Sequence, residues 1–165
     1  METAFLIENK IFLDHRGSFS PLDLTKLSKN WVQSNISVNP LKFTLRGLHF
    51  QKNEYAQAKL IKVISGKILD FVVDLRMVSP DYNKVFFFEM NEGDEVYVPR
   101  YFAHGFITLK EDTIVQYLVD NDYAPEYEGV TIWTNYPEIR EKIKKMDLSF
   151  SDDMITVAEK DLVDK

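Results

Sequence analysis

The stretch Leu45-Arg-Gly-Leu-His-Phe-Gln51 decides how the rest of this chain is interpreted. It places an arginine and a histidine on a segment of β-type sequence, and a lysine follows at position 59 on the next apolar segment. A second stretch complements it, Gly93-Asp-Glu-Val-Tyr-Val-Pro99 followed by Ala103-His-Gly-Phe106. Both stretches are typical of short strands joined by turns. We expect them to face each other inside a small β-barrel.

Short apolar segments rich in β-branched residues recur along most of the chain, with turn residues between them. The segments 59–65 and 67–74 flank Ser65-Gly66, which predicts a hairpin, and 130–133 is expected to be the last strand. Helical patterns follow only near the end, over 137–146 and 154–162. This order predicts an all-β barrel or jelly roll with short C-terminal helices. Without repeats or a low-complexity linker, residues 1–165 are expected to form a single domain.

Composition excludes several classes of function. The 165 residues include no cysteine, so a disulfide framework, a Cys-based zinc site and a thiol nucleophile are excluded. No apolar run approaches the roughly 20 residues that cross a bilayer, so no membrane association is expected. A net charge of −6 argues against general affinity for nucleic acid. The lack of cysteine and of a signal-peptide pattern favours a cytoplasmic protein.

The two opening stretches resemble the two-part signature of cupin jelly rolls. In the second part a Gly, a Pro and a His keep the expected spacing, at positions 93, 99 and 104. In the first part His49 stands at the first histidine position, whereas Gln51 replaces the second histidine and Lys59 replaces the glutamate. A metal site of this class needs neutral imidazoles and a carboxylate, and an ammonium would repel the cation. We therefore predict no metal, and a pocket suited to organic acid–base chemistry.

Beyond the cupin pattern, a series of short motifs resembles the dTDP-4-dehydrorhamnose 3,5-epimerase family over about positions 10–135. They occur in the family's order, with similar spacing: Arg16-Gly17-x-Phe19, Gln33-x-Asn35, Leu45 to Gln51, Ala56-Gln-Ala-Lys-Leu60, Asp70, Val73-Asp-Leu-Arg76, Ser79-Pro80, Phe102 to Phe106, Tyr117, Tyr123-Ala-Pro125 and Glu128.

The resemblance implies an epimerase that inverts C3, C5 or both in a nucleotide-linked 4-keto-6-deoxyhexose. His49 matches the catalytic base, Asp152 the carboxylate that orients it, and Tyr117 the acid on the opposite face of the sugar ring. Lys59 matches the residue that supports the enolate oxygen. These residue types suit the chemistry, because a 4-ketone acidifies the protons at C3 and C5. Inversion then needs a base, an oxyanion stabiliser and an acid on the other face.

The resemblance also implies the remaining parts of the site. Substrate contacts are expected from Arg16, Gln33, Asn35, Arg46, Asp70, His104 and Glu128, with the two arginines on the diphosphate and Asp70 paired with His104. The family further implies a homodimer that binds a nucleotide-diphosphate sugar, uses no cofactor and serves deoxysugar and cell-surface polysaccharide synthesis.

Some residues depart from the family pattern. Pro21 stands where a glutamate that holds the nucleotide is usual, and Ser151 stands where a lysine usually precedes the orienting aspartate. Asp153 or Asp147 could therefore take the role assigned to Asp152. The nucleotide base and the number of inverted centres are left open by these differences.

The same residues allow other interpretations. Taken alone, Lys59 could be a charged residue that protects a sheet edge, and Tyr117 could be a core aromatic. Alternative functions are a mono-epimerase, a 3,4-ketoisomerase, a metal-dependent cupin dioxygenase, and a cupin that binds a sugar without catalysis. Gln51 and Lys59 speak against the dioxygenase.

Overall fold

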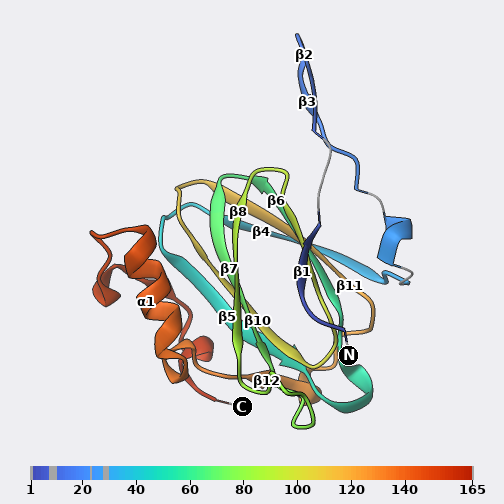
Figure 1. The fold of residues 1–165 in the computed structure, drawn as a ribbon, viewed down its shortest axis with the longest axis vertical. Coiled ribbons are helices and arrows are strands. Elements are labelled where there is room, and N and C mark those ends of the chain that lie inside the picture. The colour runs from blue at the N-terminus through green and yellow to red at the C-terminus, as the bar shows by residue number, and fades with distance from the viewer. Residues whose placement is uncertain (1, 8–10, 23, 28–29, 165) are drawn as a thin grey trace.

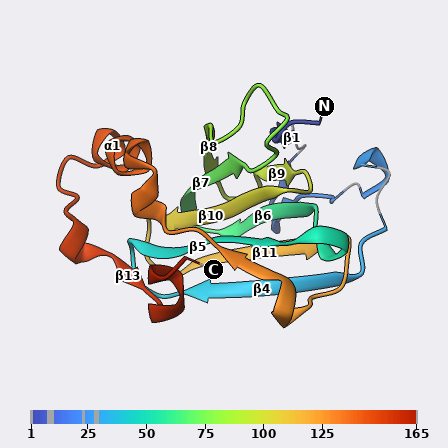
Figure 2. The same cartoon turned by 90° about the horizontal axis from the view of Figure 1, so that it is seen from below.

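Most strands form two large sheets that face each other, as the computed structural model describes them for residues 2–7, 11–22, 24–27 and 30–164 (Figures 1 and 2). One sheet, here called the β4 sheet, has the order β1 (Phe5–Ile7), β9 (Glu95–Val98), β6 (Lys59–Ser65), β11 (Thr113–Val119) and β4 (Gln33–Asn39). The other, the β5 sheet, has the order β12 (Glu128–Val130), β5 (Thr44–Gln51), β10 (Phe102–Thr108), β7 (Lys67–Asp74) and β8 (Val85–Asn91). Neighbours in these orders pair antiparallel.

The turn at Ser65-Gly66 joins two sheets rather than two strands of a hairpin. The predicted strand bounds are confirmed by β6 and β7, but the predicted pairing is wrong, because β6 pairs with β9 and β11 while β7 pairs with β8 and β10. Gly66 has φ +91°, and an added Cβ would lie 2.9 Å from the Cα of Thr113. A glycine here lets the chain turn from one sheet to the other.

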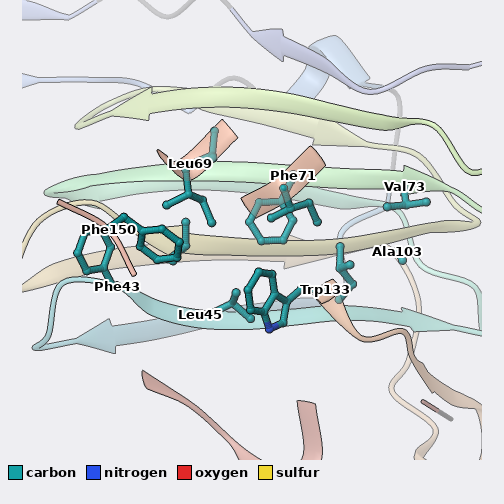
Figure 3. Packing of buried hydrophobic residues seen from close by; sticks show 12 residues of the cluster. Phe43, Leu45, Leu69, Phe71, Val73, Ala103, Trp133 and Phe150 are labelled. Carbon is teal, nitrogen blue, oxygen red and sulfur yellow. The ribbon is translucent and has the colours of Figure 1, made fainter. Parts of the chain in front are cut away.

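Two apolar clusters explain why the strands of the β5 sheet are buried on both faces. Between the sheets, Ile61 of β6, Val72 of β7 and Phe106 of β10 belong to one cluster. On the outer face of the β5 sheet, residues of β5, β7 and β10 pack with Trp133 and with Ile139 and Ile143 of α1 (Pro137–Met146). Figure 3 shows part of this outer cluster. Because β7 has apolar neighbours on both sides, its sequence is nearly continuously apolar instead of alternating.

The C-terminal part confirms one predicted helix and corrects two other predictions. The helix predicted over 137–146 is α1, which lies against the β5 sheet (Figure 1). The strand predicted over 130–133 is wrong in position, since β12 ends at Val130 and Trp133 begins a 3-10 turn. The helix predicted over 154–162 is wrong too. That segment contains the short strand β13 (Thr156–Val157), which pairs parallel with β5. Residues in this extended pairing cannot be part of a helix.

Short 3-10 turns complete the described elements: η1 (Leu24–Leu27), η2 (Asn53–Tyr55), η3 (Pro125–Tyr127), η4 (Trp133–Asn135), η5 (Asp152–Met154) and η6 (Glu159–Leu162). A small hairpin of β2 (Phe12–Asp14) and β3 (Gly17–Phe19) projects away from both sheets (Figure 1). Its apolar side chains, Leu13 and Phe19 among them, are exposed. Within the described residues, no helix has the length and apolar character that crossing a membrane requires.

Candidate functional site

A pocket of about 600 Å³ opens between the two sheets, beside the inter-sheet apolar cluster. Eight of the eleven predicted site residues line it: Gln33, Asn35, Arg46, His49, Lys59, His104, Tyr117 and Glu128. Asp70 lies directly behind this lining, against His104. The structure does not bring Arg16 or Asp152 to the pocket.

A bulge in β5 explains how Arg46 and His49 face the same pocket although they are three residues apart. The pairing of β5 with β10 goes from His49 opposite His104 to Arg46 opposite Phe106, so β5 holds one residue more than β10 over this span. Such a bulge re-aims the side chains on either side of it. Gly47 is required at this point, because its φ is +105° and an added Cβ would lie 2.5 Å from the carbonyl oxygen of His104.

His49 lies between two carboxylates. Its Nε2 is 3.0 Å from Oδ1 of Asp161, and its Nδ1 is 3.6 Å from Oε1 of Glu128. The other oxygen of Asp161 accepts the backbone N–H of Gly47 at 3.1 Å, so one carboxylate holds both the bulge and the imidazole. Burial favours a raised pKa for Asp161, but the contacts with His49 and Gly47 outweigh it, and the pKa of Asp161 is lowered.

The prediction that Asp152 orients His49 is therefore wrong, because Asp161 is the aspartate that contacts the imidazole. Asp152 lies on the surface, where its carboxylate pairs with the guanidinium of Arg140 at 2.6 Å. The alternative Asp147 is bound by Lys42 at 2.6 Å. The sequence analysis did not assign Asp161 to the site, because it predicts a helix over 154–162. The sequence does contain a pattern that could have identified Asp161. Lys160 directly precedes Asp161, which is the Lys-Asp order of the family that Ser151-Asp152 lacks.

A second histidine–carboxylate pair lies deeper in the same pocket. His104 Nε2 is 2.7 Å from Oδ2 of Asp70, and the Asp70 side chain is fully buried. The predicted pairing of these two residues is therefore confirmed. Lys59 lies nearby, and its Nζ donates a hydrogen bond to the carbonyl oxygen of His49 at 3.1 Å. Burial lowers the pKa of Lys59 to about 8, although the charges of Asp70 and Glu128 act to raise it.

Tyr117 faces His49 and His104 from the opposite sheet, whereas Lys59 belongs to β6 of its own sheet. Tyr117 belongs to β11 of the β4 sheet, whereas His49 belongs to β5 of the β5 sheet, so a ligand between them would have one on each side. Burial raises the pKa of the Tyr117 phenol, and the positive charge of Arg46 acts to lower it. Tyr117 and Arg46, which both line the pocket, are therefore within electrostatic reach of each other.

The polar residues of β4 provide hydrogen-bonding groups along the pocket wall. Gln33 Nε2 donates to Asn35 Oδ1 at 2.6 Å, which fixes the two amides relative to each other. Arg16 lies on the projecting hairpin, where its guanidinium pairs with Asp14 at 2.6 Å. Lys160 lines the pocket with the C-terminal segment and adds a positive charge that the sequence analysis did not assign to the site.

The donor groups in this pocket suit an anionic organic ligand better than a metal ion. Among the described residues, no group of three or more His, Asp or Glu side chains is arranged to hold a metal. Lys59 lies beside His49 and within reach of the charges of Asp70 and Glu128, and a cation there would be repelled by its ammonium group. Arg46 and Lys160 add further positive charge to the lining.

The sequence and the fold of this chain match known proteins of one family. Residues 1–162 match the family model described as dTDP-4-dehydrorhamnose 3,5-epimerase. A relative from Sinorhizobium fredii with that name is 40% identical over 136 residues, which cover 78% of this chain and 70% of the relative.

Solved structures agree with the described fold. The chain resembles a dTDP-4-dehydrorhamnose 3,5-epimerase from Bacillus anthracis with TDP and PPi bound, at 34% identity and a TM-score of 0.82, covering 98% of this chain and 93% of that one. It also resembles a 3'-monoepimerase from Streptomyces bikiniensis in complex with dTDP-quinovose, at 25% identity and a TM-score of 0.81, covering 98% and 82%. The predicted cupin jelly roll is confirmed by this likeness.

Proposed function

We propose that this chain, which belongs to the dTDP-4-dehydrorhamnose 3,5-epimerase family, inverts both C3 and C5 of a dTDP-linked 4-keto-6-deoxyhexose by proton transfer through an enolate. The chain is an epimerase of deoxysugar biosynthesis and so belongs to the isomerases. One observation carries the proposed mechanism. His49 and Tyr117 face the same pocket from opposite sheets, with Lys59 beside His49. We further propose that residues 1–165 act as a single cupin-like epimerase domain, without a cofactor and in the cytoplasm.

The proposed reaction begins at His49. With Asp161 next to Nε2, the lone pair available for a substrate proton is on Nδ1. Proton removal from C3 or C5 sends the electron pair of the C–H bond to the ketone oxygen at C4. The Lys59 ammonium stabilises the resulting enolate oxygen, and with a pKa of about 8 it is mostly charged at neutral pH.

Tyr117 completes the inversion. Its phenol gives a proton to the same carbon from the face opposite His49, and the ketone re-forms as the enolate electrons return to carbon. The phenolate then regains a proton from water, while His49 loses its proton to water. The raised pKa of Tyr117 keeps the phenol protonated before this step. Because both centres are next to the same ketone, one set of groups serves C3 and C5 in turn.

The remaining lining residues are proposed to bind the substrate. Arg46 and Lys160 provide positive charge for the diphosphate, and bidentate bonds from a guanidinium suit its oxygens. Gln33, Asn35 and Glu128 offer polar contacts to the sugar and nucleoside. His104, fixed by Asp70, holds the sugar near Lys59.

We propose a homodimer because of where Arg16 lies. Its hairpin stands away from the pocket of its own chain and presents exposed apolar side chains, so Arg16 can reach a bound ligand only in another copy. Co-expressing differently tagged Arg16→Ala and His49→Ala chains tests this. A dimer that pairs the two variants would contain one complete pocket, so the purified mixed dimer should recover up to half of wild-type activity. An inactive mixed dimer, or a monomer in light scattering, would contradict the exchange.

Deuterium uptake from heavy water tests the reaction. The protein is incubated with dTDP-4-keto-6-deoxyglucose, and mass and proton NMR are followed at C3 and C5. Two deuterium atoms at two inverted centres are expected. His49→Ala should abolish exchange, and Tyr117→Phe should impair inversion more than proton removal, while the exposed-loop variant Tyr82→Phe should behave as wild type. Full turnover by His49→Ala would overturn the mechanism.

A mono-epimerase is the second candidate. The 3'-monoepimerase from Streptomyces bikiniensis matches this chain with nearly the same TM-score as the 3,5-epimerase from Bacillus anthracis, so the shared fold is compatible with either reaction. The same experiment separates the two. One deuterium at C3, with C5 unlabelled and uninverted, would establish the mono-epimerase.

A further inference from the structure

We propose that Asn39 is a positioning residue that fixes the guanidinium of Arg46 for binding the substrate's diphosphate. This inference rests on the proposed function, which gives Arg46 that ligand. Asn39 is the last residue of β4 and is 1% exposed. It does not itself line the pocket. A buried amide in this position must act on the ligand through a neighbour, and Arg46 is the neighbour that lines the pocket.

The amide oxygen of Asn39 is the point of attachment for Arg46. Arg46 Nε donates to Asn39 Oδ1 at 2.8 Å, and the hydroxyl of Ser37 donates to the same oxygen at 3.0 Å. A guanidinium donates from two edges, one of which contains Nε. Because Asn39 takes the Nε hydrogen, the edge formed by the two terminal nitrogens is the one left to face a ligand. That edge can grip phosphate oxygens in a bidentate manner.

The amide nitrogen of Asn39 anchors the contact to the sheet. It donates to the carbonyl oxygens of Thr113 at 3.0 Å and of Ser37 at 3.2 Å. Thr113 is the partner of Asn39 across β4 and β11, which lie side by side in Figure 2. With both hydrogens donated and the oxygen accepting twice, the hydrogen-bonding capacity of the amide is used in full. The side chain therefore has one orientation, with its oxygen toward Arg46.

The contact between Asn39 and Arg46 links the two sheets beside the pocket. Asn39 and Thr113 belong to the β4 sheet, whereas Arg46 belongs to β5 of the opposite sheet. Without Asn39, Arg46 would be a long, largely exposed side chain that is free to change rotamer. Ordering such a side chain only when the ligand binds would weaken binding, by about 3- to 10-fold for one rotamer-rich side chain. Asn39 holds the Arg46 side chain in one conformation before the ligand binds.

The test compares ligands that differ in their phosphates. Binding of dTDP, pyrophosphate and thymidine is measured by calorimetry for wild type, Asn39→Ala and Asn39→Asp, with Ser34→Ala as the control. Ser34 is on the same strand, and its hydroxyl accepts a hydrogen bond from Gln116 at an exposed site. We expect Asn39→Ala to weaken dTDP and pyrophosphate about 3- to 10-fold and to leave thymidine unchanged. With substrate, KM should rise by a similar factor while kcat stays near wild type.

A double-mutant cycle with Arg46→Ala separates positioning from general structural damage. If Asn39 acts through Arg46, adding Asn39→Ala to Arg46→Ala should cause no further loss of pyrophosphate affinity. Additive losses, or wild-type affinity in a folded Asn39→Ala protein, would overturn the proposal. If Asn39→Ala does not fold, Asn39→Asp carries the test with the same side-chain volume. It keeps the acceptor but places a negative charge on Arg46, so diphosphate binding should fall at least as far. Wild type that binds no dTDP and exchanges no deuterium would instead overturn the proposed function.

Discussion

The two histidine–carboxylate pairs of this protein are built in different ways. His104 and Asp70 come from neighbouring strands, β10 and β7, whose register places them together in the buried interior of a sheet. His49 and Asp161 are 112 positions apart in the chain, and their contact depends on a C-terminal segment that folds back over β5. Strand pairing fixes the positions of His104 and Asp70. The position of Asp161 relative to His49 depends on how firmly the C-terminal segment is held.

This difference suggests a division of labour in the pocket. A pair held by many strand hydrogen bonds contributes to the stability of the whole fold. A pair completed by a terminal segment can be weakened while the sheets stay intact. Variants of Asp161 should therefore act mainly on catalysis, and variants of Asp70 should act on stability as well.

Among variants of the two carboxylates, the largest loss of kcat is expected for Asp161→Asn. The amide can still contact His49, but it cannot stabilise the imidazolium that forms when the base accepts a proton, so kcat should fall about 10- to 100-fold. The matched control is Asp152→Asn, which removes the same charge from the surface pair with Arg140 and should leave kcat unchanged. Steady-state kinetics measures both. A larger loss in Asp152→Asn than in Asp161→Asn would restore the assignment made from the sequence.

The same contrast explains how much of the site the sequence could predict. The resemblance to the epimerase family implied the pairing of Asp70 with His104, and its place inside an apolar strand supported it, because a buried carboxylate needs a partner. Asp161 was missed because a two-residue parallel strand has no recognisable sequence pattern, and the apolar spacing around it resembles a helix. The bulge at Gly47 was equally hidden, although Arg46 and His49 were correctly placed in one pocket.

The fold itself was predictable to a similar extent. Strand positions such as 59–65 and 67–74 follow from local pattern, and the structure confirms them. The choice between a hairpin and a crossing between sheets at Gly66 depends on the packing of Thr113 against the turn, which is a contact between distant residues. Local sequence therefore predicted the elements better than their partners.

Asp70→Ala should reduce stability, which separates the two pairs by a second measurement. Its removal leaves the buried His104 without its carboxylate partner, and an unsatisfied buried polar group costs about 1–3 kcal/mol. The free energy of unfolding from urea titration should fall by that amount. Asp161→Ala should lower it by less, because Asp161 belongs to a terminal segment joined to β5 by the two-residue strand β13, whereas Asp70 lies within β7. Equal losses in the two variants would contradict the proposed division.

Lys59 connects the pairs and should give the alkaline limb of the pH profile. Its pKa is lowered to about 8, chiefly by burial. The ammonium that stabilises the enolate is present below this pH and is lost above it, so kcat/KM should fall about tenfold per pH unit above pH 8. Lys59→Arg should move the limb to higher pH, since a guanidinium stays charged. A limb that stays near pH 8 in this variant would assign it to another group.

The smallest effect is expected from a change that loosens the C-terminal segment without touching the site. Asp164 Oδ1 accepts the backbone N–H of Ile132 at 2.7 Å, and the carboxylate also accepts from Asn135 at 3.2 Å. These bonds tie the chain three residues beyond Asp161 to the segment that follows β12. Asp164→Ala removes them and should lower kcat a few-fold by letting Asp161 move away from His49. Asp164→Asn keeps an acceptor for Ile132 and should recover most of that loss.

Hydrogen exchange at residues 156–164 should quicken in Asp164→Ala while β7 and β10 stay protected, because the sheets do not depend on this contact. If kcat falls and exchange quickens only with loss of protection in β10, the C-terminal segment and the sheets form one cooperative unit, and the two histidine pairs are not independent.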